Sequence, residues 1–231
     1  MDQTTLNNPG PCLPNGRGPG GPTGFLFHEE PHAYTLGRQR LESVSDVLLD
    51  NGLVDPQYFT RLSRERGRAV HAGIHYALLG RLDWATLHPE LHGWVRSGLR
   101  LIETLKVRVL EMETPHFHPT WLYAGTLDVL FEHQGGEVIA DYKSGAMPPT
   151  TKFSLWAYDH LQPVRQPRRH WGIKLHEDGR LATLVEFDAD RYAFEKFLAF
   201  LTTTRERVAA GVSALDMSLP TSMTEQKELT P

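Results

Sequence analysis

The stretch GTLDVLFEHQGGEVIADYK, residues 125–143, decides how this chain folds. Two apolar runs flank the turn sequence HQGG, and this pattern predicts an antiparallel hairpin of two buried strands. With the turn centred on the middle of HQGG, Asp128 lies opposite Asp141 on the same face of the sheet. Lys143, two residues further on, points to that face as well, opposite Thr126. A shift of register by one residue would separate the two carboxylates.

The carboxylates and the lysine of this hairpin have two interpretations. Carboxylates about 4.5–5.5 Å apart at Cβ repel each other unless a cation lies between them. Mg²⁺ takes carboxylate, carbonyl and water oxygens, and a lysine beside the ion would orient a water or stabilise charge on a phosphoryl oxygen. A tripeptide as short and common as D-x-K is, taken alone, more often a pair of solvated side chains on an exposed strand.

The composition limits the classes of protein to which the chain belongs. With 231 residues, 40% of them hydrophobic and 23% charged, it fits one large domain or two small ones. No apolar run is long enough to cross a bilayer and no secretory signal begins the sequence, so we expect a cytoplasmic protein. The single cysteine, Cys12, excludes a disulfide framework, a cysteine-built zinc site and a cysteine-ligated iron–sulfur cluster.

The charge is spread unevenly along the chain. The formal net charge of −4 gives no general sign of a polyanionic partner, but residues 61–68 and 164–174 are locally basic. A phosphate backbone needs a basic patch rather than a basic protein, so either segment would serve as a nucleic-acid contact. Each segment taken alone is also consistent with an ordinary solvated face.

The pattern of apolar residues predicts one folded α/β domain between two irregular ends. Residues 1–23 are rich in Gly, Pro and Asn and are expected to be disordered, the domain covers residues 24–212, and residues 213–231 are expected to form a flexible tail. The expected order predicts a mixed β-sheet flanked by helices. The expected elements are a hairpin at 25–36, a short helix capped by Ser43 and Asp46, helices at 61–79 and 89–105, strands from 107, a helix at 151–161, a hairpin at 170–187 and a helix at 191–210.

The motifs of this domain resemble those of a known family. YAGTLDVL (123–130) and VIADYKSG (138–145) look like the core of the PD-(D/E)XK nuclease superfamily, specifically the RecB-like exonucleases of recombination systems and phages. RGRAVHAGIHYAL (66–78) resembles the glycine-then-histidine helix of that branch. METPHFHPTWLYAGTLD (112–128) resembles its glutamate and aromatic-His-Pro run, and SLWAYDHL (154–161) resembles the helix with the Gln-x-x-x-Tyr motif. The resemblance runs from about residue 25 to 205.

The resemblance implies a restriction-endonuclease-like fold, DNA as the substrate, Mg²⁺ or Mn²⁺ as the cofactor, and a role for each matching residue. His71, Asp128, Asp141 and the backbone carbonyl of Tyr142 would bind the metal ion, and Lys143 would position the attacking water. The further residues that it implies are Tyr158 as a phosphate or lysine contact, Glu113 as an additional carboxylate, and Arg64, Arg66 and Arg68 as contacts to the DNA backbone.

The sequence departs from the family pattern at three points. Ser154 stands where the family has glutamine, which leaves the contacts at that position open. Asp141 stands where the superfamily often has glutamate, and aspartate is an accepted variant. With Cys12 as its single cysteine the chain lacks the four-cysteine iron–sulfur cluster of several RecB-like relatives, so the resemblance is to the cluster-free, phage-exonuclease type.

For several other residues a functional role is conceivable, but a structural role is expected. His75 follows His71 by one helical turn, but no further zinc motif accompanies it, so a surface histidine is expected. His116 and His118 alternate on one strand, where a two-histidine metal site competes with cross-strand packing, the expected role. Trp156 and Trp171 would stack on bases or, as expected, belong to the core.

Three functions of different classes follow from these motifs. The first is a Mg²⁺- or Mn²⁺-dependent DNA nuclease, expected to be an exonuclease of phage or bacterial DNA processing or recombination, with a recombination protein as a possible partner and no membrane association. The second is a non-catalytic nucleic-acid-binding or inhibitor module that keeps the nuclease fold. The third is a structural interaction protein with no metal dependence. The sequence leaves strand polarity, exonuclease against endonuclease action and oligomeric state open.

Overall fold

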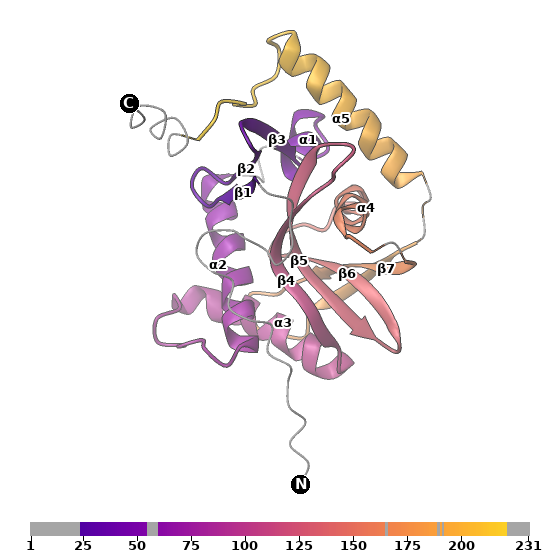
Figure 1. The fold of residues 1–231 in the computed structure, drawn as a ribbon. Coiled ribbons are helices and arrows are strands. Elements are labelled where there is room, and N and C mark those ends of the chain that lie inside the picture. Colours follow the sequence, from indigo (N-terminus) through magenta and orange to yellow (C-terminus); the bar gives the residue numbers. More distant parts are fainter. Residues whose placement is uncertain (1–23, 55–59, 165, 189, 191, 221–231) are drawn as a thin grey trace.

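A computed structural model describes residues 24–54, 60–164, 166–188, 190 and 192–220, which form an eight-stranded mixed sheet between two layers of helices (Figure 1). This architecture confirms the predicted α/β class. The strands are β1 (Phe25–His28), β2 (Ala33–Leu36), β3 (Gln39–Ser43), β4 (Arg108–Phe117), β5 (Tyr123–His133), β6 (Gly136–Lys143), β7 (Arg168–Lys174) and β8 (Thr183–Phe187). The helices are α1 (Val44–Asp50), α2 (Arg61–Leu78), the 3₁₀ turn η2 (Pro89–Leu91), α3 (His92–Leu105), α4 (Thr151–Leu161) and α5 (Ala193–Ala209).

The helices cover the two faces of the sheet in two separate hydrophobic clusters. Helices α2 and α3 pack on one face, where Val70 and Ile74 meet Val129, Val138 and other side chains of the central strands. Helices α1, α4 and α5 pack on the other face, where residues such as Leu155 and Phe197 meet Leu127, Leu130 and Ile139 of the sheet. The central strands β5 and β6 therefore contribute side chains to both clusters, as expected for strands buried on both faces.

The strand order is β1-β2-β3-β5-β6-β7-β8, with β4 along the opposite edge of β5. Strands β3 and β5 run parallel, as do β6 and β7, and the remaining neighbours are antiparallel. Strand β3 was not predicted, because QRLES has no apolar alternation. It extends the N-terminal hairpin into the main sheet by pairing Ser43 with Ala124 of β5.

Two different strands share one edge of β5 and leave a gap between them. Strand β3 pairs with Tyr123 and Ala124, and β6 pairs with β5 only as far as Val129 opposite Ala140. The backbone between these two pairings has no strand partner on this edge, although β4 continues along the other edge. The sheet therefore opens at residues 125–128, within the stretch that the sequence analysis singled out.

The register of the β5–β6 hairpin follows the prediction as far as the strands pair. Val129 lies opposite Ala140 and Leu130 opposite Ile139, which is the register that would next bring Asp128 opposite Asp141. The predicted pairing of Thr126 with Lys143 is wrong. The ladder between β5 and β6 ends at Val129 and Ala140, before it reaches these two residues. The strand partners that Thr126 and Lys143 do have, Pro115 of β4 and Lys174 of β7, lie on the other edges of β5 and β6.

The helix boundaries follow local sequence signals. Ser43 caps α1 by accepting a hydrogen bond from the Asp46 amide, and the Asp46 carboxylate accepts one from the Ser43 amide, which confirms the predicted capping box. Thr60 caps α2 in the same way through the Ser63 amide. Among the described residues, no helix is both long and apolar enough to cross a membrane.

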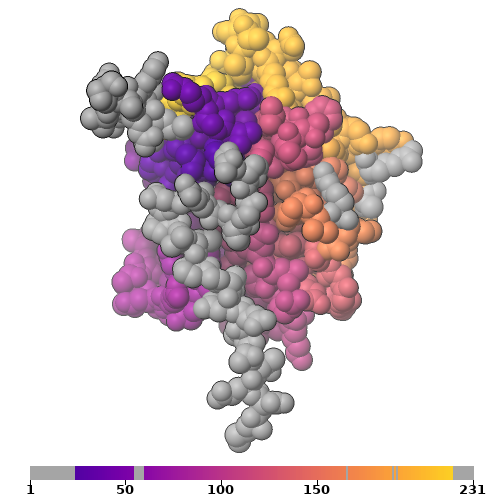
Figure 2. Space-filling model, in the orientation of Figure 1, coloured from indigo at the N-terminus to yellow at the C-terminus, as the bar shows by residue number. Residues whose placement is uncertain are grey.

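The two ends of the described chain meet at one end of the molecule, where the indigo N-terminal strands adjoin the yellow C-terminal part (Figure 2). Arg205 of α5 forms an ion pair with the buried Glu42 of β3 at 2.9 Å. Residues 213–220, which were assigned to a flexible tail, have no helix or strand but contact the domain through the hydrogen bonds Ser213–Asp50 and Arg40–Ser218. The remaining residues of the two predicted irregular ends, 1–23 and 221–231, lie outside the described residues.

A buried ion-pair cluster joins α4 to the first residues of β7. The Arg168 guanidinium, 3% exposed, bonds the carboxylates of Asp159 and Glu137 at 2.9 and 2.7 Å. The second oxygen of Asp159 bonds the buried imidazole of His170 at 3.1 Å. Removing one partner of such a cluster leaves a buried charge without compensation.

We predict that Asp159→Asn lowers the free energy of unfolding by about 3 kcal/mol, because Arg168 and His170 lose their shared carboxylate. Chemical denaturation followed by circular dichroism measures this change. The matched control is Asp178→Asn, since Asp178 is 57% exposed and lies 3.8 Å from Arg180, an arrangement expected to contribute less than about 1 kcal/mol. Equal stabilities of the two variants would contradict a structural role for the cluster.

Candidate metal and nucleic-acid site

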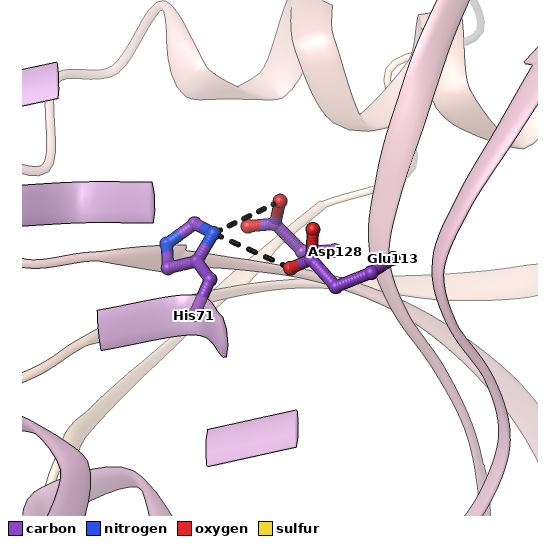
Figure 3. Close-up of side chains that lie close together, drawn as sticks. All are labelled: His71, Glu113 and Asp128. Carbon is purple, nitrogen blue, oxygen red and sulfur yellow. Dashed lines mark ion pairs between the residues drawn. The ribbon is translucent and has the colours of Figure 1, made fainter. Parts of the chain in front are cut away.

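Three potential metal ligands gather at the gap in the sheet. His71 of α2, Glu113 of β4 and Asp128 of β5 each offer one ligand atom, and these atoms lie within 4.8 Å of one another. The His71 Nδ1 atom is 3.4 Å from Asp128 Oδ1 and 3.6 Å from Glu113 Oε1, as the dashed lines in Figure 3 show. All three side chains are half-buried, so the group lies within reach of solvent.

The Glu113 backbone has a conformation that is unusual for a strand residue. Its φ of 49° lies in the left-handed region, which costs a non-glycine residue of order 1–3 kcal/mol. The pairs Met112–Val129 and Thr114–Leu127 bracket it, so that Glu113 stands opposite Asp128 on the neighbouring strand. The Glu113 carboxylate with this backbone conformation lies 3.6 Å from His71 Nδ1 and is 28% exposed, so it is not a fully solvated charge at a strand end.

The Asp128 carboxylate takes the place of a backbone partner in the gap. Its Oδ2 atom accepts a hydrogen bond of 2.8 Å from the Tyr142 amide, two residues past Ala140, the last position of β6 that pairs with β5. Burial opposes the charge of Asp128, yet the neighbouring His71 and Lys143 together hold its pKa below the usual value. Asp128 is therefore an anchored carboxylate whose other oxygen faces His71.

The His71 imidazole is oriented by a backbone carbonyl. Its Nε2 atom lies 3.1 Å from the Tyr142 oxygen, and since a carbonyl only accepts, Nε2 carries the proton. Nδ1 is thereby directed at Asp128 and Glu113, the arrangement that a metal-binding histidine has in proteins. Burial lowers the pKa of His71, but the two carboxylates outweigh it and hold the pKa well above 6.5.

Asp141 and Lys143 form a pair beside this group. Asp141 is 3% exposed, and the Lys143 ammonium lies 2.9 Å from its Oδ1 and 2.6 Å from its Oδ2. Oδ2 makes no well-directed hydrogen bond. Burial, together with the charge of Asp128, raises the pKa of Asp141 despite the lysine, which shows that the two aspartates interact electrostatically.

Tyr158 and Ser45 form the side of the site next to α1 and α4. The Tyr158 ring packs on Gly125, where a Cβ atom would lie only 2.7 Å from Cε1. Burial and the charges of Asp128 and Asp141 raise the pKa of Tyr158 well above 10, so its hydroxyl stays protonated, and it bonds Ser45. Sequence analysis missed Ser45, because the capping box that places it at the start of α1 gave no functional signal.

The predicted residues thus meet, with one rearrangement. The close group consists of His71, Glu113 and Asp128, while Asp141 lies outside it and pairs with Lys143. The Tyr142 carbonyl bonds His71. Ser154, at the expected glutamine position, donates its hydroxyl to the Thr151 carbonyl within α4.

The residues that sequence analysis assigned to the surface (His75) or to packing have structural contacts. His75 stacks on Tyr76 and Trp171 is buried in the core. His116 contacts Glu111, while the His118 ring stacks on Tyr123 and its Nδ1 accepts hydrogen bonds from two backbone amides. Trp156 packs against the buried His170 with 4.4 Å between the ring centroids.

The residues at the gap fit a divalent cation. One imidazole nitrogen and two carboxylates already converge there, and Asp141 Oδ2 is a buried acceptor without a directed hydrogen bond. Glu113, Asp128 and Asp141 bring three carboxylates next to two cationic groups, His71 and Lys143, so the carboxylates are in excess by one. Burial, followed by neighbouring charges, raises the pKa of Glu113 and of Asp141. A cation of charge two would relieve this excess.

Comparisons with known proteins give distant structural likenesses. No protein-family model matches the sequence, and no curated protein is detectably similar to it. A crystal structure of LHK-Exo in complex with dAMP is similar with a TM-score of 0.43 and 14% identity over 74% of this chain and 89% of that one. A structure of an alkaline exonuclease (LHK-Exo) from Laribacter hongkongensis has a TM-score of 0.39 and 13% identity over 81% and 93%. Both likenesses are too distant to assign a function, which must be inferred from the site itself.

We predict that His71 stabilises the metal-free protein in a pH-dependent manner. Because its pKa is raised on folding, its contribution is complete below pH 6.5 and is lost as the pH rises through the higher folded pKa. In the presence of chelator, the loss of stability caused by His71→Gln should therefore be largest below pH 6.5 and shrink at alkaline pH.

Denaturant titrations at several pH values measure this difference. His75→Gln is the matched control, because burial lowers the pKa of His75 and its effect has the opposite sign. A loss of stability in His71→Gln that is the same at every pH would show that folding does not raise the pKa of His71.

Proposed function

We propose that the protein is a metal-dependent DNA nuclease that hydrolyses phosphodiester bonds. The observation that carries the proposal is the group at the gap in the sheet, where His71, Glu113 and Asp128 converge next to the Asp141–Lys143 pair. A fold that concentrates buried carboxylates without enough compensating cations is less stable for it. Clusters of buried carboxylates are typical of functional sites, such as sites that bind a metal ion together with a phosphate group.

Each residue has a chemical role that its geometry supports. A bound divalent ion supplies the positive charge that activates a water and stabilises the leaving oxygen. The ligands that would hold the ion are His71 Nδ1, Glu113, Asp128 and Asp141 Oδ2. The Tyr142 carbonyl would either keep His71 in place or bind the ion itself. The Lys143 ammonium, 35% exposed, donates a hydrogen bond that positions the attacking water. The protonated Tyr158 hydroxyl would donate a hydrogen bond to a phosphate oxygen or help to hold Lys143 in place.

The donor set bears on the identity of the ion. Mg²⁺ prefers oxygen ligands, whereas an imidazole nitrogen is also well suited to transition metals such as Mn²⁺. With His71 among the ligands, Mg²⁺ or Mn²⁺ serves as the cofactor, and Mn²⁺ is expected to support activity well.

DNA is expected to approach along α2. Arg64 and Arg68 lie on the same side of this helix as His71. The Arg68 side chain is 50% exposed, and its guanidinium lies 3.9 Å from the Glu30 carboxylate. Cations in this position contact backbone phosphates without reading sequence. Arg66 joins them in the basic segment but points elsewhere on the helix.

More specifically, we propose that this nuclease is an exonuclease that acts in DNA processing or recombination in the cytoplasm, with a recombination protein as a partner. It rests on the resemblance of the sequence motifs to RecB-like exonucleases. The alternative, a DNA-binding or inhibitor module without catalysis, is less favoured because a binder gains nothing from carboxylates that repel phosphate.

We predict that purified protein cleaves linear DNA with Mg²⁺ or Mn²⁺ and that chelation abolishes the cleavage. Asp128→Asn and Asp141→Asn should each lower the rate at least 10²-fold, and Lys143→Ala by about 10²–10⁴-fold, because a ligand or the water-positioning ammonium is lost. Gel assays on linear and circular DNA measure the rates and separate exonuclease from endonuclease action.

Glu103→Gln, an exposed carboxylate on α3, is the matched control and should keep full activity. DNA binding without cleavage, unchanged in Asp141→Ala, would instead establish the non-catalytic module. Neither binding nor cleavage would leave the interaction protein as the surviving hypothesis.

We also predict that Mn²⁺ raises the midpoint of thermal unfolding, since an ion bound only by the folded state contributes about 2.7 kcal/mol at 100 times its dissociation constant. Glu113→Gln should remove most of this shift. In chelator the same variant should be at least as stable as the parent, because it removes a buried carboxylate whose pKa is raised. Differential scanning fluorimetry tests both parts. A variant that keeps the full Mn²⁺ shift would exclude Glu113 as a ligand.

A further inference from the structure

The three arginines at the start of α2 do not form one basic surface. Arg64 and Arg68 are four residues apart and share a face of the helix with His71, whereas Arg66 is two residues from each and lies on a different face. Four residues beyond Arg66 is Val70, which is completely buried in the core between α2, α3 and the sheet. Arg66 therefore continues the inward face of α2 at the N-terminal end of the helix.

Arg66 has no counter-ion within the part of the chain that the structure describes. Its guanidinium lies over the ring of Trp94 in α3, 5.1 Å from the ring centroid. Its Nε atom is buried and has no hydrogen-bond partner, and no carboxylate among the described residues forms an ion pair with it. A half-buried cation without a partner is costly, and a cation–π contact offsets this cost only in part.

The Nη2 atom of this guanidinium lies close to the loop that follows β6. This atom lies 4.0 Å from the position that a Cβ atom would have at Gly145, two residues beyond Lys143. Gly145 and Ala146 are exposed, so the loop that follows β6 lies at the surface. Arg66 thus reaches the same end of β6 that presents Asp141 and Lys143.

We propose that Arg66, held by Trp94 beside the exposed loop at Gly145, forms a phosphate-binding subsite for the DNA strand next to the end of β6. The inference rests on the proposed nuclease function. Guanidinium offers two parallel N–H donors that match two oxygens of a phosphate, and Trp94 packs against the plane of that fork. The glycine leaves this approach open to a sugar-phosphate backbone.

Binding rather than cleavage tests the subsite. A short fluorescein-labelled DNA is titrated with protein in Ca²⁺ and in chelator, and anisotropy gives the dissociation constant at several KCl concentrations. Arg66→Ala should weaken binding about tenfold or more, the loss expected for one charge-assisted hydrogen-bonded contact, and lower the salt dependence of log K by about 1. Arg66→Lys should restore the salt dependence but only part of the affinity, because ammonium lacks the fork.

Two further variants separate the subsite from general charge and from folding. Arg61→Ala removes the same charge from the same helix, but the Arg61 guanidinium is 88% exposed and already paired with Glu65 at 2.7 Å, so binding should change little. Trp94→Phe keeps an aromatic ring under Arg66 and should bind nearly as well as the parent, while Trp94→Leu should bind less tightly. Thermal unfolding of each variant shows whether the fold is kept.

The outcomes distinguish this inference from the proposed function. Arg66-dependent binding in a protein that never cuts DNA supports the subsite and overturns the nuclease. Cleavage and binding that Arg66→Ala leaves unchanged, or a loss equal to that of Arg61→Ala, overturn the subsite and leave the nuclease standing. An Arg66→Ala variant that only unfolds more easily identifies Arg66 as a structural residue and likewise overturns the subsite.

Discussion

The hydrogen bond between the Asp128 carboxylate and the Tyr142 amide is the contact on which the site depends. It occupies the position at which β5 and β6 stop pairing, and it holds the two strands together after their backbone ladder has ended. Because this bond uses Oδ2, the other oxygen is left to face His71. The Tyr142 residue serves both sides of the gap, since its amide binds Asp128 and its carbonyl binds the Nε2 atom of His71.

The charge of the site is balanced from two layers of the fold. His71 comes from the α2–α3 layer and Lys143 from the sheet, and together they compensate part of the charge of Glu113, Asp128 and Asp141. The compensation is incomplete, because three carboxylates lie next to two cationic groups. A protein of formal charge −4 can therefore present a site for a polyanion, provided that a metal ion and the arginines of α2 supply the positive charge locally.

The sequence predicted the parts of the structure that depend on local pattern. Turn residues predicted the β5–β6 register, and Ser43 with Asp46 predicted the capping box of α1. The spacing of apolar residues predicted the helices α2 and α4. The pairing of β3 with β5 is a long-range contact with no local signal, and the predicted partner of Lys143 was wrong because it assumed that the hairpin pairs along its whole length. The left-handed backbone of Glu113 likewise has no local signal in the sequence.

One rigid element, α2, carries His71 on one side and Arg66 on another, and this has a thermodynamic consequence. A rotation or shift of the helix displaces the imidazole at the gap and the guanidinium over Trp94 together. Occupation of either position that immobilises α2 therefore favours occupation of the other. Such linkage is reciprocal, so the ion and the polynucleotide would strengthen each other's binding by the same factor.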